Sequence, residues 1–163
     1  MSHSRRIVSS LKFALLHALV TLPMFALWEV AHAPLYSLWL ERGAAAGVKA
    51  ALHCTLGDAL IALVCALAGL LFAAWVTGLR TRLRAGALII VFGVLTTVVI
   101  ELISTQWLGR WAYRDVMPVD PIFGIGLSPL AQWLVIPAVS LHLLRRWLQA
   151  ALSSTPGAAI AIT

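Results

Sequence analysis

Four long apolar runs, separated by short polar segments, dominate the pattern of hydrophobic and polar positions along the chain. They cover about residues 13–35, 52–78, 86–108 and 126–147. A helix of about 20 apolar residues crosses the hydrocarbon core of a bilayer and pairs its backbone groups internally. None of the runs alternates apolar and polar residues as a half-buried strand does. The sequence therefore predicts an all-α fold, a four-helix transmembrane bundle. We expect one integral membrane domain over residues 1–163, with 148–163 as a flexible tail.

The composition supports a membrane environment. The chain is 61% hydrophobic and 11% charged, and its formal net charge is +6. Soluble domains contain about a quarter charged residues. A basic chain raises the question of nucleic acid, but such binding needs a basic surface. Here the charges form short clusters between apolar runs, which excludes nucleic acid and indicates the lipid bilayer as the main partner. A membrane-protein partner or a homo-oligomer is a further expectation.

The distribution of basic residues predicts the orientation of the bundle. Eight lie on one side of the predicted spans: Arg5, Arg6, Lys12, Arg80, Arg82, Arg84, Arg145 and Arg146. Four lie on the other: Arg42, Lys49, Arg110 and Arg114. The excess of basic residues usually faces the cytoplasm. We therefore expect cytoplasmic N- and C-termini, outer loops at 36–51 and 109–125, and a multi-pass protein of the bacterial inner (plasma) membrane.

One strongly polar residue in each predicted span lies at a similar depth, about six residues from the outer end. These residues are Glu29, Asp58, Glu101 and Gln132. An ionised side chain at the centre of a bilayer costs at least about 2.5–3.5 kcal/mol. The four side chains should therefore face one another inside the bundle. Glu29, Asp58 and Glu101 become candidate catalytic residues, because carboxylates can exchange protons with a substrate. The alternative is that these groups pair only to orient the helices.

Histidines beside this polar layer suggest a metal ion. His32 follows Glu29 by three residues and therefore shares its helix face. Cys54 shares a face with Asp58, and both His53 and Cys54 lie at the outer rim. Candidate metal ligands are Glu29, His32, His53, Asp58 and Glu101. Carboxylate and imidazole groups suit a divalent metal such as Fe, Mn or Zn rather than Cu(I). His17 and His142 could bracket a haem, but the pattern favours ordinary buried or solvated histidines.

The segment after the third run combines aromatic and basic residues. It reads WLGRWAYRDVMP and contains Arg110, Trp111 and Tyr113. One interpretation is an interfacial segment whose aromatic rings and arginines contact lipid headgroups. The other is a lid over the polar layer, with Arg110, Trp111, Tyr113 and Gln132 as cofactor-binding candidates.

Three stretches, WEVAHAPLY, HCTLGD and WLGRWAYRDVMP…GIGLSPLAQW, resemble the pattern of small multi-pass bacterial inner-membrane proteins. The resemblance spans roughly residues 24–140 and implies a membrane location, but it brings no established activity. The residues themselves predict an outer-side pocket that binds a metal ion or a small ligand and that could be catalytic. A non-catalytic subunit or assembly factor of a membrane complex, and a small transporter, remain alternatives. Whether the protein is an enzyme stays open at this point.

Overall fold

The computed structural model describes residues 3–76 and 82–153, with side chains from residue 7 onwards. Its described residues form helices and loops, with two isolated β-bridges. The helices are α1 (His3–His32), α2 (Leu38–Trp75), α3 (Arg82–Leu102), α4 (Leu127–Leu143) and α5 (Arg145–Ser153). A 3-10 helix (Ala33–Leu35) follows α1, and a π-helical turn (Ile103–Trp107) continues α3.

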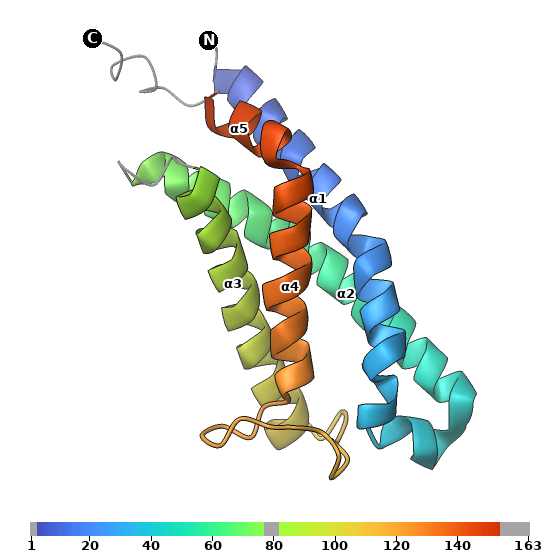
Figure 1. Cartoon of the computed structure of the whole chain (residues 1–163). Helices are drawn as coiled ribbons and strands as arrows, with labels where there is room; N and C mark the ends of the chain where they lie inside the picture. The colour runs from blue at the N-terminus through green and yellow to red at the C-terminus, as the bar shows by residue number, and fades with distance from the viewer. Residues whose placement is uncertain (1–2, 77–81, 154–163) are drawn as a thin grey trace.

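The helices run back and forth along one common direction (Figure 1). The start of α1 and the whole of α5 lie at one end of the bundle, which we call the α5 end. The turn after α1 and the segment Leu108–Gly126 lie at the opposite end, which we call the loop end. This arrangement puts the basic clusters around Lys12, Arg84 and Arg145 near the α5 end.

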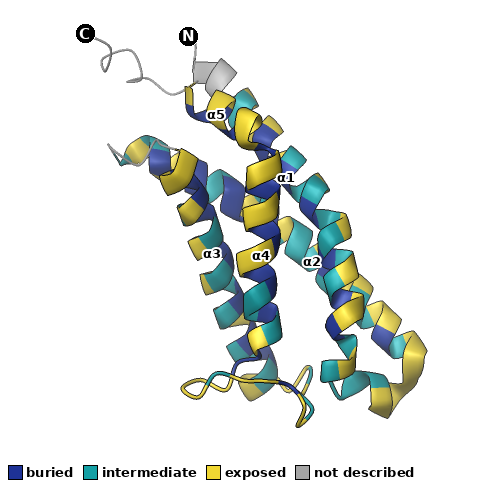
Figure 2. Cartoon of the chain, viewed as in Figure 1, coloured by how far each residue is buried: buried dark blue, intermediate teal, exposed yellow. Residues whose placement is uncertain are grey.

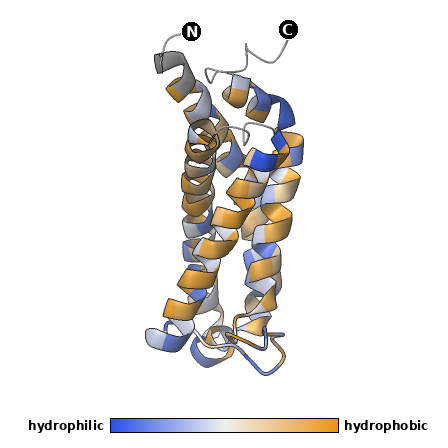
Figure 3. Ribbon diagram, turned by 90° about the vertical axis from the view of Figure 1, so that its left-hand side faces the viewer, coloured by the Kyte–Doolittle hydropathy of each residue, from blue (hydrophilic) through white to orange (hydrophobic). Residues whose placement is uncertain are grey.

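Several helices are long and apolar enough to cross a membrane. Within the described residues these are Ile7–Leu35, Leu38–Trp75 and Arg82–Trp107. The pair α4 and α5, bent by 76°, makes a fourth candidate if it counts as one span. Large apolar side chains such as Leu27 and Leu60 project outwards at 73% and 60% exposure, as the yellow positions in Figure 2 illustrate. Hydrophobic residues cover most of the length of the helices in Figure 3. Such a surface suits lipid rather than water, and it supports a multi-pass membrane protein.

The second helix starts much earlier than the sequence predicts. Residues 36–51 were expected as an outer loop, but most of them belong to α2. Hydropathy drops there because of Glu41, Arg42 and Lys49, whereas the alanines at 44–46 are strong helix formers. The break that the helix does contain is at Gly43, whose φ of +77° favours glycine.

The C-terminal part also differs from expectation. The fourth helix ends at Leu143, and residues 145–153 form α5 instead of the end of a span and a flexible tail. Leu148 and Leu152 of α5 are buried against the bundle, so this helix is packed rather than frayed. Residues 154–163 of the expected tail, and Arg80, lie outside the described residues.

Two clusters of buried apolar side chains hold the bundle together. The larger one lies towards the α5 end and includes Phe13, Leu70, Ile89, Leu141 and Leu148. The smaller one consists of Phe25, Ala62, Trp133 and Ile136. These four residues form one cluster, in which the ring centroids of Trp133 and Phe25 lie 5.1 Å apart. The second cluster separates the larger core from the polar layer.

Candidate functional site

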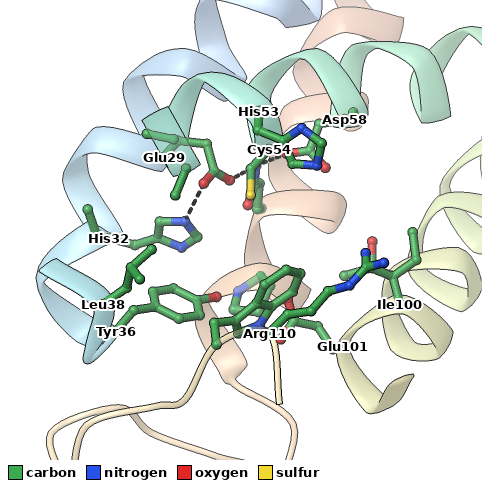
Figure 4. A pocket seen from close by; sticks show the side chains of 18 of the residues that line it. Glu29, His32, Tyr36, Leu38, His53, Cys54, Asp58, Ile100, Glu101 and Arg110 are labelled. Atoms are coloured by element: carbon green, nitrogen blue, oxygen red, sulfur yellow. Dashed lines mark hydrogen bonds and ion pairs between the residues drawn. The ribbon is translucent and has the colours of Figure 1, made fainter. Parts of the chain in front are cut away.

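A cavity of about 320 Å³ lies between α1, α2, α3 and α4 near the loop end. Its lining includes the three carboxylates of Glu29, Asp58 and Glu101, each from a different helix, and Gln132 of α4. Figure 4 shows Glu29 and His32 on one side of the cavity, with Ile100, Glu101 and Arg110 on the other. The four polar residues of the predicted layer, one from each helix, therefore line a single space.

Gln132 joins two of the carboxylates. Its Nε2 atom donates to Glu29 Oε1 at 3.2 Å and to Asp58 Oδ2 at 2.8 Å. An amide nitrogen carries two N–H donors, so each carboxylate receives one of them. Helices α1, α2 and α4 are thereby linked through one buried side chain.

His32 extends this hydrogen-bond chain towards the loop end. Its Nε2 lies 3.1 Å from Glu29 Oε2, and its Nδ1 lies 3.0 Å from Ser128 Oγ. Ser128 Oγ also accepts a hydrogen bond from Trp28 Nε1 at 3.3 Å. The Ser128 hydroxyl has one donor and two acceptor sites, so it can still donate to Nδ1. A neutral His32 imidazole would then carry its proton on Nε2, facing Glu29.

Glu101 has its own partners, which come from the segment after α3. Its Oε2 accepts hydrogen bonds from the Tyr113 hydroxyl and, at 3.3 Å, from Trp111 Nε1. Burial first, and the hydrogen bond to Glu101 second, raise the pKa of Tyr113, so the phenol keeps its proton and acts as the donor. The pKa of Tyr36 is raised by burial and then by the charge of Glu101. Both tyrosines therefore keep their protons, and Tyr113 donates its proton to Glu101.

The loop end of the cavity is covered by the chain itself. Arg114 donates its backbone N–H to Leu35 O at 2.9 Å and its Nη1 to Pro34 O at 2.7 Å. Ser37 N–H donates to Ala112 O at 3.0 Å. These bonds join the segment after α3 to the turn after α1, and the rings of Tyr36 and Tyr113 meet there at 5.5 Å.

One polar side chain in the cavity has no partner. Thr97 of α3 is 6% exposed, and its hydroxyl makes no hydrogen bond to another described residue. A buried hydroxyl without a partner costs about 1–3 kcal/mol. Thr97 lines the cavity but its Oγ1 atom is buried, so a rotation of the side chain would let a bound molecule supply the missing hydrogen bond.

The floor of the cavity is apolar. Moving one helical turn towards the α5 end, Glu29 is followed by Phe25, Asp58 by Ala62 and Gln132 by Ile136. All three are at most 2% exposed. On these three helices the polar layer ends there, whereas α3 places Thr97 one turn from Glu101.

The remaining site candidates are divided between the cavity and its edge. His53 and Arg110 line the cavity but are exposed, whereas Cys54 is half-buried. Cys54 lies on α2 beside the carboxylates, while Arg110 lies beyond α3 at the opposite edge. Among the described residues, no group of three or more His, Cys, Asp or Glu side chains could hold a metal ion. The expected ligand set therefore reduces here to the Glu29–His32 pair.

The two histidines considered as haem ligands, His17 and His142, lie in different environments. His17 is fully buried, with its Nδ1 atom 2.9 Å from Ser140 Oγ, and His142 is exposed. The pattern of the sequence favours ordinary buried or solvated histidines at both positions, and this stays a prediction.

Several lining residues were not among the sequence candidates. Thr97 lies four residues before Glu101, so helical spacing places it beside a candidate. Tyr36 follows α1 and its ring lies 5.2 Å from that of His32. Trp133 gave no such signal, because a buried tryptophan in a span usually indicates packing, and Trp39 was expected in an outer loop. Searches against protein-family models, curated proteins and solved structures find no match to this chain. What the cavity does is therefore inferred from its own geometry.

Proposed function

We propose that this protein binds a small molecule in the cavity near the loop end, through a group that donates hydrogen bonds or carries positive charge. The observation that carries the proposal is the meeting of three carboxylates with the unpartnered hydroxyl of Thr97 around about 320 Å³ of space. Ligand cavities usually start at about 300 Å³ and combine apolar walls with a few placed polar groups. Ile61, Ile100 and Trp133 supply apolar walls here.

The carboxylates favour a cationic ligand. Glu29 and Asp58 accept from the same amide nitrogen, so they are close enough that two ionised carboxylates there would repel each other. A positively charged group between them would relieve that repulsion in a medium of low dielectric constant. Arg110 is the only lysine or arginine among the described lining residues and lies at the edge, where it does not neutralise the interior.

Proton exchange is the catalytic form of this proposal. Glu29 and His32 form a carboxylate–imidazole pair at 3.1 Å, and Ser128 orients the imidazole. Such a pair can take a proton from a bound ammonium or hydroxyl group and return it. In this form Glu29, Asp58 and Glu101 touch the ligand, with Glu29 and His32 as the acid–base pair.

Other candidate functions have weaker support. A divalent metal (Fe, Mn or Zn) at Glu29 and His32 would need a further ligand from the molecule that binds with it. A transporter would need a polar path through the apolar floor formed by Phe25, Ala62 and Ile136, which are buried. A structural subunit would not require the empty space around Thr97.

The test is a titration of the full-length protein, purified in an uncharged detergent, with butylamine, butanol, Zn²⁺ and Mn²⁺. At a hundred times its Kd, butylamine should stabilise the protein by about 2.7 kcal/mol and so raise the thermal unfolding midpoint. Butanol offers one neutral donor and no positive charge, so its effect should be much smaller. The double variant Glu29→Gln/Asp58→Asn should lose the response to butylamine.

Thr97→Val tests the role of the cavity hydroxyl, and Thr96→Val is its matched control. Thr97 lines the cavity and Thr96 does not, so only the first substitution should weaken the response. An equal response in the wild type and in the double variant would overturn the proposal, as would a response to metal ions alone.

A further inference from the structure

The cavity has an open side between α2 and α3, although its loop end is covered. Towards the α5 end these two helices touch: a Cβ atom added to Gly69 would lie 2.6 Å from Cγ1 of Ile89. One helical turn closer to the loop end on α2, Cys65 Sγ lies 4.0 Å from Thr96 Oγ1 of α3. Ile61, one turn closer to the loop end on α2, lines the cavity, as does Thr97, next to Thr96 on α3. The two helices diverge towards the loop end in Figure 1.

Exposure identifies the same opening. The lining residues that reach the surface include His53 on α2, Ile100 on α3 and Arg110 just beyond α3. Ile100 is 37% exposed, although its neighbour Glu101 is buried. Figure 4 shows His53 and Asp58 on one side of the cavity facing Ile100 and Arg110 on the other. In a bundle with a lipid-facing surface, an opening between two spans faces the bilayer.

The charges are ordered by depth within this opening. Carboxylates of Glu29 and Asp58 and the free hydroxyl of Thr97 lie inside, where they can accept or exchange hydrogen bonds with an ammonium group. Arg110 lies at the edge, where its guanidinium can bind a phosphate group. A ligand with an inner amine and an outer phosphate matches this order. The apolar Ile61 and Ile100 then provide a surface for an attached hydrocarbon chain.

We propose that the opening between α2 and α3 admits an aminophospholipid headgroup, whose primary ammonium binds Glu29, Asp58 and Thr97 while its phosphate binds Arg110. This inference rests on the proposed cation-binding function and specifies its ligand. The same phosphoethanolamine chemistry could also arrive as a free, water-soluble molecule, which lacks the hydrocarbon chain. A trimethylated amine lacks N–H donors, so it cannot make the inner hydrogen bonds.

The experiment is native mass spectrometry of the full-length protein, equilibrated with equal amounts of phosphatidylethanolamine, phosphatidylcholine and phosphatidylglycerol that carry identical acyl chains. We expect the ethanolamine lipid to exceed the choline lipid among bound molecules by about tenfold, the effect of one or two charge-assisted hydrogen bonds. Glu29→Gln/Asp58→Asn should reduce this ratio to about one. Arg110→Gln should lower the binding of the ethanolamine lipid severalfold.

Two neighbouring positions on α3 test the opening itself. Ile100→Trp should block entry and abolish lipid binding. Val99→Trp is its control, because Val99 is 53% exposed but does not line the cavity. Equal effects of the two substitutions would overturn the α2–α3 opening. Far-UV circular dichroism verifies that both variants fold.

The remaining outcomes separate this inference from the general one. If O-phosphoethanolamine competes as well as the lipid at equal concentration, the hydrocarbon chain and the lateral entry are wrong, although the cation pocket survives. If butylamine binds but the ethanolamine lipid does not exceed the choline lipid, only the lipid inference fails. If neither amine binds, both proposals fail.

Discussion

At the scale of single residues, the carboxylates of Glu29 and Asp58 lie where they lower the stability of the ligand-free protein. Asp58 and Glu29 share the amide of Gln132, and both are held in the interior of a bundle whose surroundings are apolar. Functional sites often retain such unfavourable groups, so that replacing them stabilises the protein and removes its activity. Replacing a carboxylate should therefore raise the free energy of unfolding if it belongs to a binding site, and lower it if it is a structural polar contact.

Asp58→Asn should therefore stabilise the ligand-free protein by about 0.5–2 kcal/mol, a range common for substitutions of this type. The neutral amide removes the repulsion with Glu29 but can still accept from Gln132. Unfolding by sodium dodecyl sulfate, followed by circular dichroism, measures the free energy of unfolding. Asp115→Asn, in the exposed loop, serves as the control and should change little. A marked destabilisation by Asp58→Asn would mean that this carboxylate is there to hold the helices.

Asp120 gives a pH-dependent prediction outside the spans. Its carboxylate accepts the backbone N–H of Phe123 at 2.8 Å, of Ile122 at 3.0 Å and of Ile125 at 2.6 Å. These hydrogen bonds, led by that of Phe123, lower the pKa of Asp120. Because the pKa is lower in the folded protein, these hydrogen bonds stabilise the loop fully at pH values above the ordinary aspartate pKa. The stabilisation is lost as the pH falls through the pKa of Asp120 in the folded protein.

We expect the amide resonances of Ile122, Phe123 and Ile125 to titrate together in NMR spectra, with a midpoint below the ordinary aspartate pKa of about 3.9. Asp120→Asn keeps an acceptor oxygen but cannot titrate, so its amide resonances should stay constant over the same range. A midpoint at or above the ordinary value would contradict the hydrogen bonds described for this loop.

The depth of the polar residues could be predicted from sequence, but their partners could not. Counting residues from the span ends was enough to place Glu29, Asp58 and Gln132 at one level. Glu101 was expected to face the other polar side chains of the layer, whereas its Oε2 accepts from Tyr113 and Trp111. Those residues follow a π-helical turn and a loop with Gly109 at φ +55°. The path of such a segment depends on tertiary contacts with Leu35 and Pro34, which no helical period encodes.

At the scale of the helices, α2 shows how one close contact sets the shape of the site. A Cβ atom at Gly69 would approach the backbone nitrogen of Ile89 to 3.3 Å, besides its side chain. At Gly57, on the same helix, a Cβ atom would meet nothing within 4 Å. The two glycines thus differ in packing while they share a helix.

Gly69→Ala should destabilise the protein by about 1–3 kcal/mol, because overpacking forces α2 and α3 apart. Gly57→Ala should be neutral or stabilise by up to about 1 kcal/mol, since alanine is the better helix former. The same detergent unfolding experiment measures both variants. Equal changes in the two would show that α2 and α3 are not in close contact at Gly69.

The existence of the helices was predicted well, and their ends were predicted poorly. Hydropathy located the centre of each run, because apolar side chains that face lipid or core are required there. It missed the first part of α2, where Glu41, Arg42 and Lys49 are charged but the alanines between them still favour a helix. It also extended the fourth run past Leu143, although the chain turns by 76° between α4 and α5. Composition detects burial in lipid, whereas a bend depends on local backbone geometry.

At the scale of the whole molecule, the loop end and the α5 end should face opposite sides of the membrane. Asp115 lies in the segment at the loop end, and Arg84 lies near the start of α3 at the other end. The excess of basic residues at the α5 end predicts that this end is cytoplasmic. The cavity would then lie in the outer half of the bilayer.

Single cysteines test this topology in a Cys54→Ala/Cys65→Ala background. With a membrane-impermeant maleimide, Asp115→Cys should be labelled in intact cells, and Arg84→Cys only after the membrane is permeabilised. The reverse pattern would invert the orientation and place the cavity in the inner half. Labelling of both positions in intact cells would contradict the membrane-spanning arrangement.

The bend after α4 has a consequence for the bilayer. The 17 residues of α4 extend over only about 25 Å at 1.5 Å per residue, which is less than the hydrocarbon thickness of about 30 Å. Hydrophobic mismatch of this size is usually relieved by local thinning of the lipid around the short span. The protein should therefore carry a dimple in the membrane beside α4 and partition into thinner bilayers. The acyl chain length of the bilayer would then determine what fraction of the protein is correctly inserted.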